Sequence, residues 1–570
     1  MDYIRKMKIA RGEELAELVL KNCRIINVYS GEIEDADIAI EGEMILGVGS
    51  YSGKIEHNLK HAYVAPGFID GHVHIESSML TPPGFAKMII PKGTTTIIAD
   101  PHEIANVSGN KGIQFMLDAS EKIPLNVLIM IPSCVPATIE ENSGAVITAE
   151  DIQTFLLHPK VLGLGEVMDY PAVIRGDYLM HEKIELMRKR VIDGHAPDIL
   201  GFDLNAYIAS GVMTDHESTV EISLTERIKR GMYVHLREGS ATRNVKALLK
   251  GITKENIHRT LFCTDDKHPF DIESEGHINY NVNLAIDFGI DPVDAIRMAT
   301  LNAANCYNLP HLGGIAPNKQ ADLIVFDNLK KIEPKLVFYK GQLVAKDGKA
   351  LFDLHVDIPK EITNTVQFDD SILNFDLKLK SNKVHVIGLV QGNITTKDCI
   401  REVKVENGLF IYDDQIDIIK LAVIERHKNR KKIGLGLVEG FQIKNGALAM
   451  TIAHDSHNLL ILGTNDQDMT LAAKKIKEIQ GGIVLVRNGK VEDFLQLEVA
   501  GIMTANSEVL VQETLLRMKD KIKEMGLAKE VDDPFISLAF LALPVIPDLK
   551  LTDRGLFDVN QYKIIPIEIE

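Results

Sequence analysis

The chain of 570 residues is too long for a single hydrophobic core, and we expect roughly two to four domains. A hydrophobic content of 45% and a charged content of 25% are typical of an ordinary globular protein. The formal net charge of -17 excludes nucleic acid as the main partner, because binding to phosphates needs a basic surface.

The cysteines and the apolar segments indicate the compartment. The five cysteines are scattered and form no CxxC pair, so they predict a reducing environment without disulfides. Residues 1–20 carry charges throughout and lack the apolar core of a secretory signal. The stretch PFISLAFLALPVIP (534–547) is interrupted by prolines and is shorter than the ~20 residues that span a bilayer. We therefore expect a cytoplasmic protein with no membrane partner.

Two segments far apart in the sequence share a pattern of short strands. Val, Ile and polar residues alternate across 18–65, interrupted by Gly-containing turns, and 321–352 repeats this pattern. We expect the two segments to pair in one small β-sandwich domain. This domain would consist of residues 1–65 and 318–365, with the intervening chain inserted between them.

The inserted chain, 66–317, alternates short apolar runs with helical stretches. Eight buried parallel strands that alternate with helices indicate an α/β fold of the (β/α)8 TIM-like barrel type, and about 250 residues is its usual size. The eight runs end in HVH (72–74), IIAD (97–100), IMIPS (129–133), GEVMD (165–169), DGHAP (193–197), TDHES (214–218), HLREG (235–239) and CTDD (263–266).

The ends of these predicted strands carry side chains that bind metals. Residues two apart on a strand point to the same side, so His72 and His74 direct two imidazoles into one space. Active sites of this fold lie at the C-terminal ends of the strands. Imidazole together with carboxylate suits Zn, Fe, Mn or a similar divalent ion. The candidate metal ligands are His72, His74, Glu166, His195, His216 and Asp265.

The number of candidate ligands predicts more than one ion. Six ligands exceed what one tetrahedral ion needs, and a carboxylate such as Glu166 can bridge two ions in a dinuclear centre. Taken singly, each strand-end residue is more often an ordinary loop residue. His195 could belong to a turn, and Asp265 could cap a helix. The ordered set at the ends of separate strands favours the metal centre.

Four further residues near the strand ends have two interpretations each. Glu103 in ADPHEIANV could contact a metal-bound water or a substrate, or it could be a carboxylate at a helix start. Arg237 and Glu238 could contact a substrate or form a structural ion pair. Glu76, which follows the HVH motif, could line the pocket or cap a loop.

The remaining chain, 366–570, alternates predicted strands with helical stretches, and we expect a separate α/β domain. Its segment TIAHDSHN (451–458) places His454 and His457 three residues apart, where they could face one side of a helical turn. We expect this segment either to cover the barrel mouth and add substrate contacts, or to form a polar turn. The basic run RHKNRKK (426–432) lies between apolar strands, and we predict a solvated turn there.

Several of these motifs resemble a known family. DGHVH, GEV, GHAP, DHES and CTDD, in this order, resemble the motifs of the amidohydrolase superfamily. More narrowly, PGFIDGHVHIESSM, ADPHEIANV and TIAHDSHN resemble the bacterial adenine deaminases, over essentially the whole chain. The resemblance implies that adenine is a small-molecule substrate, converted with water to hypoxanthine and ammonia in purine salvage. It also implies a divalent metal cofactor, a dinuclear centre of Mn or Fe with Zn as an alternative. The extra domain is compatible with a homo-oligomer, a dimer or larger.

The same resemblance implies roles for individual residues. Many amidohydrolases have a carbamylated lysine at the fourth strand, where this chain has Glu166, as adenine deaminases do. In the implied mechanism metal-activated hydroxide attacks C6 of adenine, and Asp265 carries the water proton to the leaving amine. Glu103 is a second catalytic candidate. The candidates for substrate binding are Arg237, Glu238, Glu76, His454 and His457.

Two other hypotheses remain open. A different amidohydrolase, which opens a cyclic amide or removes an acyl group, could use the same ligand set, although Glu166 argues against the cyclic amidases. A non-catalytic scaffold on the same fold would have lost ligands, whereas every ligand position is filled here. Zinc deaminases of the cytidine type need a PCxxC motif, which this sequence lacks.

Overall fold

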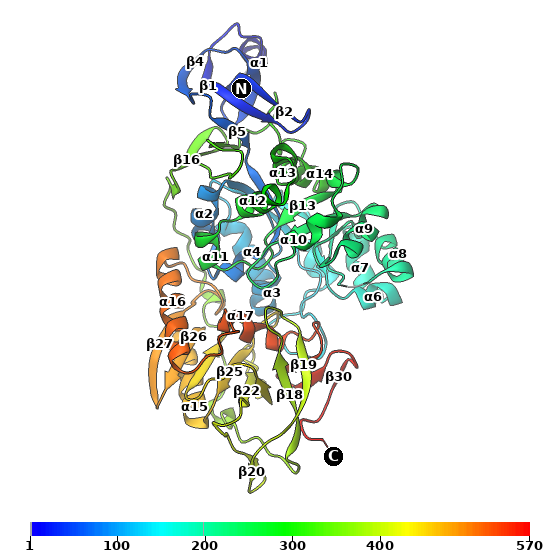
Figure 1. Cartoon of the computed structure of the whole chain (residues 1–570), viewed down its shortest axis with the longest axis vertical. Coiled ribbons are helices and arrows are strands. Elements are labelled where there is room, and N and C mark those ends of the chain that lie inside the picture. The colour runs from blue at the N-terminus through cyan, green and yellow to red at the C-terminus, as the bar shows by residue number, and fades with distance from the viewer. Residues whose placement is uncertain (1–2, 198, 570) are drawn as a thin grey trace.

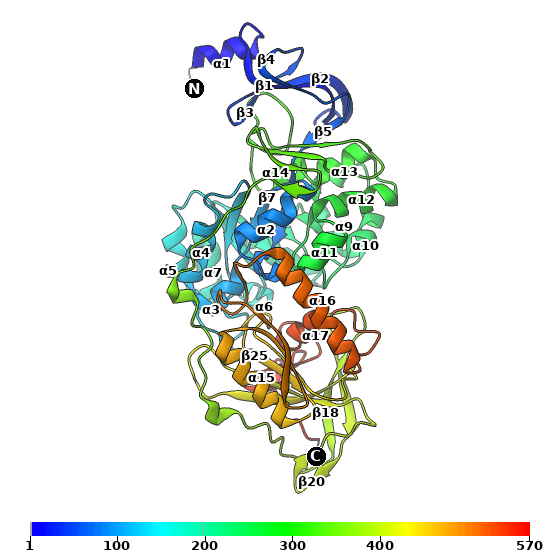
Figure 2. The same ribbon diagram turned by 90° about the vertical axis from the view of Figure 1, so that its left-hand side faces the viewer.

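The computed structural model describes residues 3–197 and 199–569. The molecule is elongated, and three parts follow one another along its long axis (Figure 1). A sheet that contains the first strands lies at one end, and a part built of parallel strands and helices lies in the middle. A β-rich part that ends near the C-terminus lies at the other end (Figure 2).

The first part is a sheet built from both flanks of the inserted chain. Its order is β17-β16-β15-β14-β5-β1-β2-β3, with β4 paired to β1, which makes nine strands among the described residues. Strands β5 and β14 pair antiparallel, so strands from both flanks of the inserted chain lie in one sheet. The elements are α1 (Tyr3–Ala10), β1 (Ala16–Asn27), β2 (Glu32–Glu41), β3 (Met44–Gly49), β4 (Gly53–Asn58), β5 (Tyr63–Pro66), β14 (Leu323–Phe326), β15 (Leu336–Tyr339), β16 (Gln342–Lys346) and β17 (Lys349–Ala350).

The middle part contains all eight strands that the sequence predicts. Parallel strands covered by helices on their outer face are buried on both sides, and every residue of β6, β7 and β13 is buried accordingly. The strands are β6 (Phe68–Val73), β7 (Thr94–Ala99), β8 (Asn126–Ile131), β9 (Val161–Val167), β10 (Val191–Gly194), β11 (Thr214–Asp215), β12 (Tyr233–Arg237) and β13 (Thr260–Cys263).

Hydrogen bonding divides these eight strands into two parallel sheets, and the single closed barrel stays a prediction from the sequence. The first has the order β10-β9-β8-β7-β6 and the second β11-β12-β13. At one junction, the N–H of Gly194 donates to the side-chain Oγ1 of Thr214 (3.1 Å) and not to a backbone carbonyl, so no regular ladder joins β10 to β11. At the other, a single parallel bridge links Val73 to Asp265.

Helices follow most of these strands and surround them (Figure 1). Their apolar faces pack onto the strands in one extended core, in which Ile97, Ile129 and Leu164 are fully buried. The helices are α2 (Pro82–Ile89), α3 (His102–Ser108), α4 (Asn110–Ala119), α5 (Ala149–Phe155), α6 (Tyr170–Arg175), α7 (Tyr178–Leu186), α8 (Gly201–Ala209), α9 (Glu221–Lys229), α10 (Val245–Leu248), α11 (Pro269–Ser274), α12 (Ile278–Phe288), α13 (Pro292–Met298) and α14 (Leu301–Cys306).

The last part is β-rich, which corrects the prediction of an α/β domain with alternating elements. Its main sheet has the order β19-β18-β23-β22-β25-β24-β26-β27, and a separate sheet contains β28, β29 and β30. The main elements are β18 (Lys383–Leu389), β19 (Thr396–Glu402), β22 (Ile419–Ile424), β23 (Ile433–Glu439), β24 (Ala447–Met450), β25 (Leu459–Gly463), α15 (Asp466–Ile479), β26 (Gly482–Arg487), β27 (Lys490–Gln496), α16 (Glu508–Glu524), α17 (Pro534–Ala539), β28 (Leu549–Thr552), β29 (Gly555–Asp558) and β30 (Lys563–Ile564).

Short connections explain this difference from the prediction. A parallel pair needs a crossover of about a dozen residues or more, whereas a short loop returns the chain antiparallel. The loops between β22 and β23 and between β26 and β27 are short, and both pairs are antiparallel. The long helix α15 separates β25 from β26 in the way that the sequence pattern suggested, and it packs on the sheet beside β24, β25 and β26.

The β-rich part lies against the middle part on the side where the strands of the middle part end. Thr504 exchanges backbone hydrogen bonds with Met79 (2.9 Å) and Thr81 (3.2 Å), just after β6. Asp553 accepts from the backbone N–H of Asn142 at 3.0 Å. This arrangement brings C-terminal residues to the carboxyl ends of the parallel strands.

Across 3–197 and 199–569, none of the helices combines the length and the apolar character that a membrane span requires.

The close approach of β10 and β11 generates a prediction about Gly194. A Cβ at this position would lie 2.2 Å from the backbone oxygen of Thr214, and backbone atoms cannot move aside cheaply. We expect Gly194→Ala to lower the free energy of unfolding by about 2–3 kcal/mol, measured by thermal and denaturant unfolding. The control is Gly84→Ala in α2, where the nearest atom lies at 3.3 Å and belongs to a side chain. Equal stability of both variants would contradict the prediction.

Candidate metal centre

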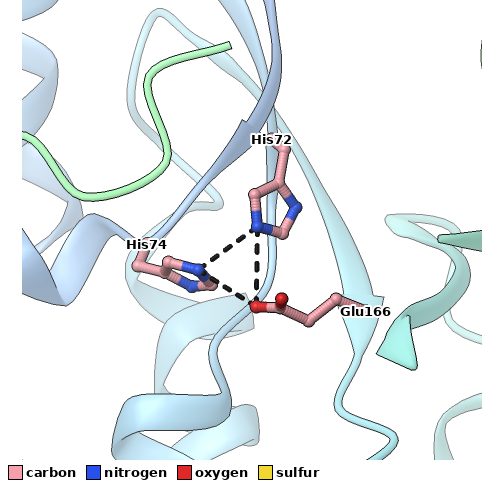
Figure 3. Close-up of side chains that lie close together, drawn as sticks. All are labelled: His72, His74 and Glu166. Carbon is pink, nitrogen blue, oxygen red and sulfur yellow. Dashed lines mark hydrogen bonds and ion pairs between the residues drawn. The ribbon is translucent and has the colours of Figure 1, made fainter. Parts of the chain in front are cut away.

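His72 and His74 direct their imidazoles into one buried space at the end of β6 (Figure 3). Their Nε2 atoms are 3.2 Å apart and lie 3.6 Å and 3.2 Å, respectively, from Oε1 of Glu166. His74 donates its Nδ1 hydrogen to the carbonyl of Asp100 (2.9 Å), so in the neutral imidazole Nε2 carries the lone pair. Nitrogen lone pairs and a carboxylate oxygen that face one another at this spacing suit a shared cation.

The other oxygen of Glu166 faces a second pair of imidazoles. Oε2 lies 2.5 Å from Nδ1 of His195 and 3.2 Å from Nε2 of His216. Asp265 completes the group, because its Oδ1 lies 3.1 Å from Nε2 of His74. The structure therefore brings all six sequence-predicted ligands together, and several triads among them have the spacing that holds a metal ion. Each oxygen of Glu166 therefore faces its own pair of imidazoles.

The protonation states of His72 and Glu166 suit metal binding. Burial opposes the charged forms of His74 and His195, but the carboxylates beside them outweigh burial and raise the pKa of both imidazoles. Burial, together with the nearby His216, lowers the pKa of His72 to about 4, so this imidazole is neutral. Burial opposes the ionisation of Glu166, but His195 and the other imidazoles around it outweigh burial and hold its pKa well below the usual range. A neutral imidazole and an ionised carboxylate are the forms that bind divalent cations.

Arg237, at the end of β12, forms an ion pair with Asp265 rather than facing open space. Its Nη1 donates to Oδ2 of Asp265 at 2.6 Å and also to Glu217. Burial opposes the ionisation of Asp265, but the guanidinium outweighs it and holds the pKa of this carboxyl well below its usual range. The alternative interpretation of Arg237 as an ion-pair residue therefore has direct geometric support.

Glu217 is a site residue that sequence reasoning missed. It lines the central pocket and lies 3.7 Å from His195 and 3.6 Å from His216. Its only sequence signal is its position directly after His216 in the DHES motif. Phe540, which also lines the pocket, had no signal, because it comes from a distant apolar segment.

Glu103 is bound by two histidines from the β-rich part. His454 Nδ1 lies 2.5 Å from Oε1 of Glu103, and His457 Nε2 donates to Oε2. His457 Nδ1 accepts the backbone N–H of Ala453 (3.1 Å), so Nε2 carries the hydrogen. Burial raises the pKa of Glu103, but these imidazoles outweigh burial and hold it well below its usual range. The two histidines lie on a non-helical turn, and both face the same carboxylate.

Glu76 and Glu238 lie outside the central pocket. Glu76 is buried and accepts the backbone N–H of Ile104 at the start of α3 (3.2 Å). Glu238 accepts the backbone N–H of Val245 (3.1 Å) at the start of α10. Both carboxylates therefore accept hydrogen bonds from backbone N–H groups at helix starts, and burial raises the pKa of both.

The pocket itself lies between the middle and β-rich parts. Its floor is formed by the metal-ligand cluster, and its other walls include Met168, Ile394, Leu543 and Val545. The ring of Phe540 stacks on His454 with their centroids 4.4 Å apart. A wider cavity of about 750 Å³ adjoins the pocket and shares Ala241, Thr242, Ile394 and Phe540 with it, which gives a small molecule a route from solvent.

Comparison with known proteins identifies the family. Residues 63–349 match the amidohydrolase family, and residues 393–563 match the adenine deaminase C-terminal domain. Adenine deaminase 2 of Carboxydothermus hydrogenoformans is 46% identical over 564 residues, which cover 99% of each chain. Adenine deaminase of Clostridium acetobutylicum is 46% identical over 566 residues, 98% of this chain and 99% of the relative.

The chain belongs to the adenine deaminase family of the amidohydrolase superfamily. The resemblance found in the sequence motifs is thereby confirmed, and the chain is an adenine deaminase-type hydrolase with a buried cluster that could hold a metal. Among solved structures, β-aspartyl dipeptidase from Fervidobacterium islandicum is similar to this adenine deaminase family member, with a TM-score of 0.47 and 17% identity. That similarity covers 60% of this chain and 100% of the dipeptidase.

The position of Glu166 between two imidazole pairs generates a prediction about metal content. We expect Glu166→Gln to lose most of the bound divalent metal, because a neutral amide carries no charge to balance a cation and offers one oxygen where the carboxylate offers two. Elemental analysis of purified protein after loading with Mn or Fe(II) measures the effect. The matched control is Glu185→Gln, whose side chain is 69% exposed. Metal content equal to that of the unmodified protein would contradict a role of Glu166 as a metal ligand.

Proposed function

We propose that the chain catalyses hydrolytic deamination of adenine to hypoxanthine and ammonia. The observation that carries this proposal is the 46% identity to adenine deaminases over 98–99% of the chain. Support also comes from the donor set, because four imidazoles and two carboxylates in one buried space suit a pair of divalent ions. We propose Mn or Fe for this pair, with Zn as the alternative.

The reaction breaks the bond between C6 of adenine and its amino nitrogen and forms a C6–O bond from water. A divalent metal pair held by His72, His74, Glu166, His195, His216 and Asp265 would supply activation of that water at neutral pH. The chain must then move one proton from the water to the leaving amine. Ammonia leaves with that proton, and the ring that remains is hypoxanthine.

Asp265 is the proposed proton carrier. Its Oδ2 is bound by Arg237, so the ion pair orients the carboxylate and leaves Oδ1 directed to the metal-ligand cluster. The ionised form is favoured in this position, so Asp265 can accept the proton from the water and release it to the amine. Arg237 therefore acts in this proposal by positioning Asp265.

Glu103 is proposed to bind a ring N–H of the purine. Each of its oxygens accepts one hydrogen bond from an imidazole, and a carboxylate oxygen has a second lone pair to offer. His454 and His457 are thus proposed to act on substrate through Glu103. Apolar side chains such as Ile394 and Leu543 line the same pocket and suit a flat ring that excludes water from the site.

The proposal includes the domain organisation. We propose a small β-sandwich domain of residues 1–65 and 318–365, a (β/α)8 barrel of 66–317 and an additional domain of 366–570. Support for a closed barrel comes from the bridge between Val73 and Asp265 and from the Gly194–Thr214 contact, which link the two parallel sheets at both junctions. Five unpaired cysteines, all within the described residues, suit the reducing cytoplasm. This organisation is also compatible with a homo-oligomer.

Substrate assays test this function. We expect ammonia release from adenine after separate loading with Mn, Fe(II) or Zn, and loss of that activity on chelation. Adenosine, a hydantoin and an N-acetyl sugar serve as parallel substrates. Turnover of the hydantoin or the sugar without turnover of adenine would replace the proposal with a different amidohydrolase activity, and failure to bind any metal would favour a scaffold.

The hydrogen bonds on Glu103 predict a change in pH dependence. His454→Phe keeps a ring against Phe540 but removes one donor that stabilises the ionised carboxylate. The pKa of Glu103 should therefore rise from its depressed value, and the acid limb of kcat/KM should move to higher pH. The control is His385→Phe on β18, whose imidazole lies near Asp398 at the surface. If the acid limb lies at the same pH in both variants, the ionisation of Glu103 does not set the acid limb of kcat/KM.

A further inference from the structure

The basic run of residues 426–432 does not form the fully solvated turn that the sequence predicts. Lys428, Asn429 and Arg430 are exposed as expected, but the prediction is wrong for Arg426, whose side chain is fully buried. His427 is half-buried beside it. A buried guanidinium is costly unless its donors are satisfied, so the structure of this turn needs a physical explanation.

Arg426 bonds to uncharged oxygens of three separate segments. Its Nε donates to the carbonyl of His457 (2.5 Å), and its Nη2 to the carbonyl of Ala500 (3.0 Å). Its Nη1 donates to the carbonyl (2.9 Å) and the hydroxyl (3.0 Å) of Thr365. The planar fork of an arginine can satisfy acceptors in several directions at once, which a lysine ammonium on a flexible stem cannot reproduce.

His427 binds the carbonyl of Ser456, which precedes the carbonyl of His457 that Arg426 binds. Its Nε2 donates to the carbonyl of Ser456 at 2.8 Å, and because that acceptor is a carbonyl, Nε2 carries the hydrogen. Two successive side chains of the turn therefore bind two successive carbonyls, those of Ser456 and His457. This loop is the one that carries both histidines bound to Glu103.

The turn and its surroundings are built to accept this arrangement. The buried carboxylate of Glu425 accepts the backbone N–H groups of His427 (2.9 Å), Lys428 (2.7 Å) and Arg430 (2.7 Å), which fixes the turn. Gly501 has a φ of +73°, and a Cβ there would lie 2.9 Å from Nη1 of Arg426. A glycine at this position leaves the space in which the guanidinium lies.

We propose that Arg426 and His427 are positioning residues that hold the loop of residues 451–458 so that His454 and His457 bind Glu103 in the substrate pocket. This inference rests on the proposed function for the role of Glu103 in binding the purine. Because the ring of His457 is fixed by its own loop backbone, a shift of the Ser456–His457 peptide moves both imidazoles relative to the carboxylate. The residues act through this loop and do not touch the substrate.

Steady-state kinetics with adenine tests the positioning role. We expect Arg426→Lys, which keeps the charge but loses the fork, to raise KM about tenfold with a smaller change in kcat and unchanged metal content. His427→Phe should raise KM in the same way, whereas His427→Gln, which keeps a donor near the position of Nε2, should restore it to within about threefold. The control is Arg401→Lys, which breaks a two-point contact with Glu439 at the exposed edge of the β-rich part.

A double variant tests whether the effect passes through Glu103. In a Glu103→Gln background, Arg426→Lys should raise KM by less than about twofold, because the interaction that it supports is already lost. A full tenfold effect in that background would overturn the proposal. Unchanged KM in both Arg426→Lys and His427→Phe would also overturn it, as would equal values for His427→Phe and His427→Gln.

Hydrogen exchange distinguishes failure of this inference from failure of the proposed function. Amide exchange in residues 451–458 should rise in Arg426→Lys and His427→Phe but not in Arg401→Lys, whatever the substrate. If the unmodified protein does not turn over adenine, the proposed function fails, and faster exchange then still supports the anchoring of this loop. Unchanged exchange in folded variants would overturn the anchoring itself.

Discussion

Glu166, Asp265 and Glu103 are buried carboxylates around one small pocket, and keeping them ionised is the constraint on which the rest of this site depends. A buried charge without a partner is costly, so each carboxylate has its own cation or donor set. Glu166 lies between two pairs of imidazoles, Asp265 is bound by the guanidinium of Arg237, and Glu103 accepts from two histidines. These partners come from different strands and from the β-rich part, so the charges can be satisfied only when the chain is fully folded.

The middle part and the β-rich part therefore form the pocket together. The histidines that bind Glu103 lie 351 and 354 residues further along the sequence than the carboxylate itself. The parallel strands supply the ligand cluster at their carboxyl ends, as expected for this class of fold. The β-rich part supplies the facing wall and the hydrogen-bond donors on Glu103. An otherwise unexplained buried arginine, Arg426, lies behind that wall and bonds to the loop that forms it.

Much of the fold was accessible from sequence because the pattern of apolar runs is local. Each of the eight runs became a strand, and their polar ends carried the cluster. How the two parallel sheets meet was not accessible, because at one junction the N–H of Gly194 donates to the side chain of Thr214 from the next strand. The antiparallel character of the last part was missed for a related reason: helical periodicity in two segments suggested alternation, whereas short loops set the strand direction.

The sequence by itself determined the residue types of the metal centre and their order, since a histidine or carboxylate at a strand end keeps that position in any fold with parallel strands. Only the tertiary structure decided which partner each of them has. Arg237 and Glu103 had two interpretations each until the positions of Asp265 and His454 were known. The turn at Arg426 was misjudged because charge alone predicts exposure, whereas burial depends on backbone carbonyls brought together from three distant segments.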